Sequence, residues 1–139
     1  ATAKAKGIPN EPSETDRAHL EELITCLLDP LREDWSVYCV DNKLGSPALI
    51  VTSGYRGFRL NSDPAINGSK SSAHCIGYAA DIVPRNGQME FFVEFVKVWK
   101  ENIAFDQIIW ERCIAGVPTW VHFGYKNQLG QQRCQVFSL

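Results

Sequence analysis

Two histidines and an aspartate are the residues of this sequence whose types and spacing could do chemistry together. His74 and Asp81 stand seven positions apart, at the end of a polar stretch in which Arg56 follows a predicted strand. His122 lies near the end of the chain, in the segment Trp120-Val121-His122-Phe123. A catalytic zinc ion takes three nitrogen or oxygen ligands and keeps one position open for water. His74, Asp81 and His122 are therefore candidate ligands of one metal ion.

Spacing alone leaves a simpler alternative open, in which each of these residues is an ordinary hydrogen-bonded side chain beside a strand. The helical pattern H-E-x-x-H is absent, so a metal site would have to be assembled from separate strands. His19 is interpreted as a surface residue of a helix. Cys75 could be considered as a soft ligand or a nucleophile, but adjacent residues on a strand or turn point apart, so we do not assign it to the site.

Two helices are expected to support these residues. The first begins near Ser13 and carries apolar residues at spacings of three and four; these are Leu20, Leu23, Ile24, Leu27, Leu28 and Leu31. Pro30 is expected to kink or end its last turn. The second helix is predicted over residues 88–102, and its aromatic residues are expected in the core.

Six strands are predicted, at Trp35–Val40, Ala48–Thr52, Tyr78–Val83, Gln107–Glu111, Thr119–Tyr125 and Arg133–Phe137. The first two are expected to form a hairpin, and so are the fourth and fifth, which a Gly-Val-Pro segment separates. A long loop follows the second strand, with one helical turn expected at residues 58–61. The predicted fold class is α+β, with two main helices packed on a mainly antiparallel sheet that holds the metal site.

Length and composition predict a single domain. The chain has 139 residues, of which 45% are hydrophobic, and we expect an extended arm over residues 1–12 and one domain over residues 13–139. The net charge of -2 gives no general attraction to nucleic acid. No apolar run reaches the roughly 20 residues of a membrane span. We expect a monomer.

Five cysteines occur without a C-x-x-C pair, so we expect free, largely buried thiols from a reducing compartment. A single disulfide between Cys113 and Cys134 is the alternative left open. The first seven residues lack the apolar segment of a secretory signal, so we expect synthesis in the cytoplasm.

The polar stretch contains the pattern S-x-H-x-x-G-x-A-x-D over residues 72–81, preceded by S-G-Y-R at residues 53–56 and followed by W-V-H at residues 120–122. This combination resembles the signature of the zinc D-alanyl-D-alanine carboxypeptidases, a family that includes phage L-alanyl-D-glutamate endolysins. The resemblance covers nearly all of the chain. It implies a Zn2+ peptidase that cuts peptidoglycan stem peptides, with His74, Asp81 and His122 as the zinc ligands.

The resemblance also implies roles for two residues of the long loop. Arg56 matches the arginine that binds substrate and stabilises the oxyanion, a role suited to a guanidinium because it stays charged and offers several fixed donors. The alternative for Arg56 is a solvated loop charge or a partner of Asp63. Ser72 is expected to hold a neighbouring backbone group or the substrate.

One position departs from the family pattern. Many relatives carry an acidic general base three residues before the last histidine, where this chain has Thr119. Glu111 is the best substitute, because it closes the strand that pairs with the strand of His122, and Asp106 is the second choice. Whether Glu111 faces the metal depends on a hairpin register that the sequence does not determine.

Two functions remain in view. The first is a peptidase of D-Ala-D-Ala carboxypeptidase or L-Ala-D-Glu endopeptidase type, and the sequence does not decide between these bonds. The absence of an export signal favours a phage or prophage lysis enzyme that acts on the cell wall. The second is a non-catalytic wall-binding or phage structural module that retains the fold, which Thr119 favours.

Overall fold

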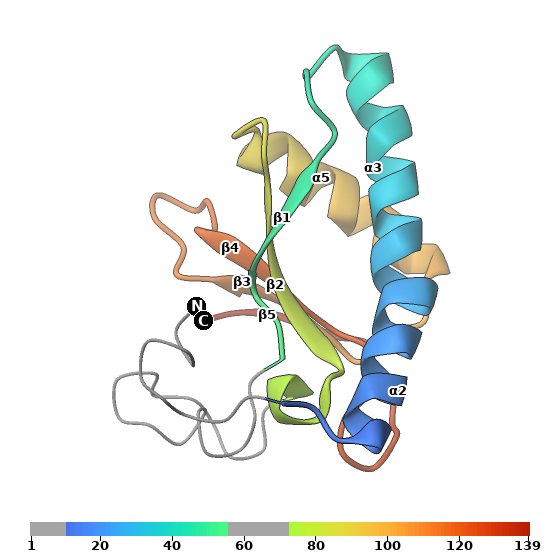
Figure 1. The fold of residues 1–139 in the computed structure, drawn as a ribbon. Coiled ribbons are helices and arrows are strands. Elements are labelled where there is room, and N and C mark those ends of the chain that lie inside the picture. Colours follow the sequence, from blue (N-terminus) through green and yellow to red (C-terminus); the bar gives the residue numbers. More distant parts are fainter. Residues whose placement is uncertain (1–10, 56–72) are drawn as a thin grey trace.

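A long helical rod opens the part of the chain that the computed structural model describes, which is residues 11–55 and 73–139 (Figure 1). The rod consists of α2 (Glu14–Leu23), the π-helical turn η1 (Ile24–Leu28) and α3 (Asp29–Asn42). Ser13 caps α2, because its side-chain oxygen accepts the backbone N–H of Asp16 at 3.1 Å. The first helix predicted from the leucine spacing is therefore present, but the helical rod continues beyond the predicted end to Asn42.

The expectation that Pro30 kinks or ends this helix is wrong, because the rod continues to Asn42. Pro30 lies in the first turn of α3, and its ring would clash with the carbonyl four residues earlier in a regular α-helix. The wider π turn relieves that clash, since the backbone N–H of Asp29 donates to the carbonyl of Ile24, five residues back.

The strand predicted at Trp35–Val40 is also wrong, and so is the hairpin that it was expected to form with the next strand. This segment belongs to α3, where Leu31, Trp35 and Cys39 follow each other at spacings of four and are buried. Val37 and Val40 are exposed on the opposite side. A window of six residues alternates well enough for a strand, but the buried residues follow the helical period.

The other five strands are present and form one sheet. They are β1 (Leu49–Ser53), β2 (Ala79–Pro84), β3 (Gln107–Glu111), β4 (Trp120–Gly124) and β5 (Gln135–Ser138), in the spatial order β1-β2-β4-β3-β5. Neighbouring strands pair antiparallel, except that β3 and β5 are parallel. The predicted hairpin between β3 and β4 is confirmed.

The core lies between the helices and one face of this sheet. Helix α5 (Met89–Trp99), which the 3₁₀ turn η3 (Lys100–Asn102) extends, packs beside α3 on that face (Figure 1). The buried side chains include Leu27, Leu31, Trp35, Ile82, Phe92, Val96, Ile108, Val121 and Phe123. Burial of each large apolar side chain contributes roughly 1.5–3 kcal/mol. The α+β prediction is confirmed, and the second face of the sheet carries the candidate site.

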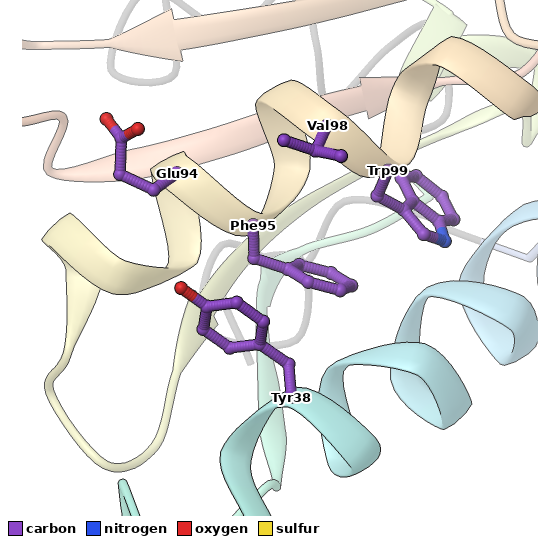
Figure 2. Close-up of a pocket in the computed structure, with 5 residues that line it drawn as sticks. All are labelled: Tyr38, Glu94, Phe95, Val98 and Trp99. Carbon is purple, nitrogen blue, oxygen red and sulfur yellow. The ribbon is translucent and has the colours of Figure 1, made fainter. Parts of the chain in front are cut away.

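A groove of about 470 Å³ lies between α3 and α5, on the side of the sheet that the helices cover. Figure 2 shows its lining residues, which are Tyr38, Glu94, Phe95, Val98 and Trp99. None of these residues was predicted to act in the site. In the described part of the chain, no helix is long and apolar enough to cross a membrane.

The cysteines differ from the expectation of largely buried thiols. Cys39 and Cys75 are buried, but Cys26, Cys113 and Cys134 are exposed. Cys113 and Cys134 are both free thiols, so the disulfide between them is not formed.

Candidate metal centre

The pairing of β2 with β4 brings Asp81 and His122 together. The two residues lie directly opposite each other in this antiparallel pair, so their side chains point to the same face of the sheet. The neighbours of Asp81 and His122 along the strands, Ala80 and Phe123, point into the core instead. The Oδ1 atom of Asp81 lies 3.0 Å from Nδ1 of His122.

The third residue, His74, comes from the 3₁₀ helix η2 (Ala73–Ile76), which lies directly before β2. Its Nε2 atom is 3.2 Å from Oδ1 of Asp81. Its Nδ1 atom donates to the carbonyl oxygen of Gly54 at 2.6 Å. That hydrogen bond orients the imidazole and leaves Nε2 directed toward Asp81, which is the arrangement that a metal-binding histidine uses.

The structure therefore brings the three predicted ligands together. One ligand atom from each of His74, Asp81 and His122 lies within 4.8 Å of the other two, and all three residues are buried. No further His, Cys, Asp or Glu joins this group within residues 11–55 and 73–139. Two imidazole nitrogens and one carboxylate oxygen are the ligand set of a catalytic zinc site with one open position, so the donor chemistry fits zinc.

Asp81 carries its negative charge at the centre of this group. Burial alone would raise the pKa of Asp81, but the hydrogen bonds and charges of His122 and His74 outweigh burial and hold the pKa well below its usual range. Asp81 is thus a carboxylate at any pH at which the histidines can be neutral, as metal binding requires.

The hairpin register places Glu111 on the same face as these residues. Ile109 lies opposite His122 and Glu111 lies opposite Trp120, so Glu111 projects from the site face two residues along the hairpin. Burial raises the pKa of Glu111, the charge of Asp81 raises it further, and His122 and His74 lower it. Glu111 is therefore close enough to the cluster to interact with its charges.

Thr119, which occupies the position of the acidic base in many relatives, has a different role. It is exposed, and its hydroxyl donates to the backbone carbonyl of Arg112 at 2.8 Å. Its backbone N–H also donates to the carbonyl of Glu111 at 2.9 Å. Thr119 thus stabilises the hairpin end beside Glu111.

Asp106, the second choice for the base, is bound to Arg133. Both of its carboxylate oxygens accept hydrogen bonds from the guanidinium at 2.8 Å, and one oxygen also accepts the backbone N–H of Arg133 at 3.0 Å. Burial raises the pKa of Asp106, but the hydrogen bonds from Arg133 outweigh burial and lower the pKa overall. These contacts give Asp106 a structural role at the start of β3.

Arg56 and Ser72 lie outside the described residues, together with the helical turn expected at residues 58–61. The described residues on either side of that stretch are Tyr55, next to Gly54, and Ala73, next to His74.

The sequence analysis missed the part that His19 has near the site. This residue was interpreted as a surface histidine, but it is half-buried and its Nδ1 atom donates to the carbonyl of Ile76, two residues after His74. Its place four residues before the buried Leu23 on the same helix was the available signal.

Comparison with known proteins assigns a family to this arrangement. A family model described as peptidase M15 matches residues 15–122 of the chain, a span that includes His74, Asp81, Glu111 and His122. A search of curated proteins gave no match.

Proposed function

The chain belongs to the peptidase M15 family, and from this premise we propose that it hydrolyses peptide bonds in the stem peptides of peptidoglycan. M15 peptidases depend on zinc, so the family and the donor chemistry of the buried cluster point to the same metal. The observation that carries the proposal is the convergence of His74, Asp81 and His122 from three elements onto one point of the sheet. In the proposal these three residues hold the zinc ion.

The candidate general base is Glu111. Bound zinc supplies a Lewis acid that polarises a peptide carbonyl and makes water more acidic. Glu111 accepts the proton of the attacking water and returns it to the leaving amine, a role that needs a carboxylate on the metal side of the sheet. The raised pKa of Glu111 supports this role, because a stronger base accepts a proton more readily.

In this proposal the substrate contacts come from Arg56 and Ser72. Arg56 stabilises the negative charge that develops on the carbonyl oxygen, and Ser72 holds the peptide. The resemblance to the family signature supports both assignments, because S-G-Y-R at residues 53–56 precedes the metal motif at residues 72–81 in this sequence as well.

Two bonds are candidates for cleavage, the terminal D-Ala-D-Ala bond and the internal L-Ala-D-Glu bond. A synthetic stem pentapeptide that begins with L-Ala-D-Glu and ends with D-Ala-D-Ala contains both. Incubation with zinc-loaded protein, followed by mass analysis, is expected to show loss of either the last D-alanine or the first L-alanine. An uncleaved peptide together with a full zinc content would contradict the proposed activity.

The second candidate is a wall-binding module without turnover, which Thr119 in the position of the acidic base favours. Such a module would bind purified peptidoglycan and leave its peptides intact. The location of Glu111 on the metal side of the sheet favours the peptidase, because it supplies the carboxylate that position 119 lacks.

A further inference from the structure

The first turns of α2 contact the chain on both sides of His74. We propose that Asp16 and His19 are positioning residues of the metal centre, which hold the two segments around His74 and so set the affinity for zinc. The inference rests on the proposed zinc site. It assigns a role in the site to α2, which supplies none of the candidate ligands.

His19 holds the segment after His74. Its Nδ1 atom donates to the carbonyl oxygen of Ile76 at 2.6 Å, which fixes the last residue of η2. Its ring stacks on Tyr78, with ring centres 4.0 Å apart and an angle of 17° between the planes. The hydrogen bond to Ile76 and the ring stacked on Tyr78 together hold the end of this short helix and the residues that follow it.

Asp16 holds the segment that orients the His74 ring. Its carboxylate accepts the hydroxyl of Tyr55 at 3.0 Å. Tyr55 directly follows Gly54, whose carbonyl accepts Nδ1–H of His74 at 2.6 Å. Asp16 thus acts on the imidazole of His74 through Tyr55 and the adjacent Gly54. His19, one helical turn later, acts on the same imidazole through Ile76, two residues after His74.

Gly77 allows α2 to approach this closely. A Cβ atom at this position would lie 2.6 Å from the backbone carbonyl oxygen of Asp16 and 3.4 Å from Cβ of His19. Gly77 also has a φ of +85°, which L-residues rarely adopt. Any side chain here would push α2 away from η2, so the contact depends on the glycine.

A further contact connects α2 to the start of β2. The hydroxyl of Tyr78 donates to the carboxylate of Glu22, and Lys126 approaches the other oxygen of Glu22 at 3.4 Å. Helix α2 therefore fixes the segment from Ile76 to Tyr78 at three successive positions. Three residues later in the chain, Asp81 supplies the carboxylate of the candidate site.

Zinc affinity should respond to these contacts because a metal ion requires its ligand atoms at fixed positions before it binds. Loss of groups that orient a ligand typically weakens metal binding about 10- to 100-fold. If α2 only covered the sheet, loss of the Asp16 or His19 side chain would change the affinity for zinc little.

The test compares His19→Ala with a matched substitution on the same helix, Arg17→Ala. The side chain of Arg17 is largely exposed, and its ion pair within residues 11–55 and 73–139 is a surface contact with Glu11 at 3.9 Å. Zinc affinity is measured by competition with a chelator, and the spectrum of the cobalt-substituted protein reports the geometry of the ligands. We expect about 10-fold or greater weakening and an altered cobalt spectrum in His19→Ala, and no change in Arg17→Ala.

Conservative variants separate positioning from folding. In His19→Asn the side-chain amide can donate from nearly the same place as Nδ1, so we expect it to recover most of the zinc affinity. Tyr55→Phe removes one hydrogen bond on the other side of His74 and is expected to weaken zinc binding several-fold. Thermal unfolding of the metal-free proteins shows whether each variant is folded.

Wild-type affinity and an unchanged cobalt spectrum in both His19→Ala and Tyr55→Phe would overturn the inference. Equal losses of zinc in His19→Ala and Arg17→Ala would do so as well. The measurement does not depend on cleavage: a protein that binds zinc through this network but cuts no peptide would contradict the proposed function alone. A wild-type chain that binds no zinc would contradict both.

Discussion

Asp81 is the residue on which the candidate site converges. Its Oδ1 atom contacts an imidazole nitrogen of His122 at 3.0 Å and one of His74 at 3.2 Å. All three side chains are buried, and each offers an atom of a type that binds zinc. With the ion, the same atoms would converge on one positive centre, so the hydrogen-bonded cluster already resembles a ligand set.

The first prediction concerns the ligands. The His122→Ala variant is expected to lose zinc, while the wild-type protein holds about one zinc per chain, because two ligands cannot replace three. Metal analysis after dialysis measures the content. Gln107→Ala is the matched control, since Gln107 lies opposite Gly124 on the same face of the sheet and is not a candidate ligand. Full zinc retention in His122→Ala would remove this residue from the site.

The second prediction concerns the base. Glu111→Gln keeps the size of the side chain but cannot accept a proton, so zinc content should stay normal while turnover falls roughly 10²- to 10⁴-fold. Glu94→Gln, an exposed glutamate on α5, should keep full activity. Turnover within a few-fold of wild type in Glu111→Gln would reject the role.

The pH dependence of activity tests the same residue. The carboxylate form of Glu111 is the active one, and burial followed by the charge of Asp81 raises its pKa above the ordinary value of 4.5. In the zinc-free protein the carboxyl group of Glu111 should therefore titrate above pH 4.5, which NMR of the labelled side chain measures, and in the zinc-loaded enzyme activity should fall as the pH decreases through the pKa of Glu111. A zinc-free pKa at or below 4.5 would contradict the placement of Glu111 beside Asp81.

At the scale of elements, an ion pair between buried Asp106 and partly exposed Arg133 connects the start of β3 with the chain that enters β5. Asp106 is 2% exposed and accepts three hydrogen bonds from Arg133. Because β5 is short and lies at the edge of the sheet, this contact determines how well it stays paired with β3.

The Asp106→Asn variant is expected to unfold more easily at neutral pH, by about 2 kcal/mol, since hydrogen bonds to charged groups contribute roughly 1.5–3 kcal/mol. The pKa of Asp106 is lowered in the folded protein, so its stabilisation is present above the unfolded pKa of about 3.9 and is lost as the pH falls through the folded value. Denaturant unfolding of both proteins at pH 7 and pH 3 measures this. A difference that stays the same at both pH values would argue against the charged contact.

The elements show where the sequence was sufficient. Apolar residues at spacings of three and four over a long window predicted the first helix and α5, and short runs such as Ala48–Thr52 predicted five strands to within about two residues. The segment 35–40 was misread because six residues cannot distinguish alternation from helical spacing. The helix also continues through Pro30 because a π turn precedes it. No residue pattern in the sequence marks such a turn.

The candidate site shows what the sequence could not determine. The family signature identified His74, Asp81 and His122 from their types and order, but it could not show that Glu111 faces them. That depends on a register in which a shift of one residue reverses the face. The contacts of His19 with Ile76 and Tyr78 join residues 57 and 59 positions apart, so no local pattern contains them.

At the scale of the molecule, the three candidate ligands come from η2, β2 and β4, so a bound ion joins segments that are distant in sequence. Zinc that binds only the folded chain stabilises it by about 4 kcal/mol at a thousand times its Kd. Removal of zinc by a chelator should therefore lower the Tm of the wild-type protein. In His122→Ala the chelator should have no effect, and an equal decrease in both would show that the metal binds elsewhere.

In the described residues, helices α3 and α5 cover one face of the sheet (Figure 1). The strand registers place the candidate ligands Asp81 and His122, and Glu111, on the other face. In this chain of 139 residues the main apolar cluster lies on the side of the helices, so the other face of the sheet is available for a buried polar site.

The most direct measurement of the central claim is digestion of purified peptidoglycan with zinc-loaded protein, followed by mass analysis of the released peptides. We predict new termini at one stem-peptide bond with the wild-type protein, and none with Glu111→Gln at the same zinc content. Peptidoglycan whose peptides remain intact after incubation with the fully zinc-loaded wild-type protein would contradict the account.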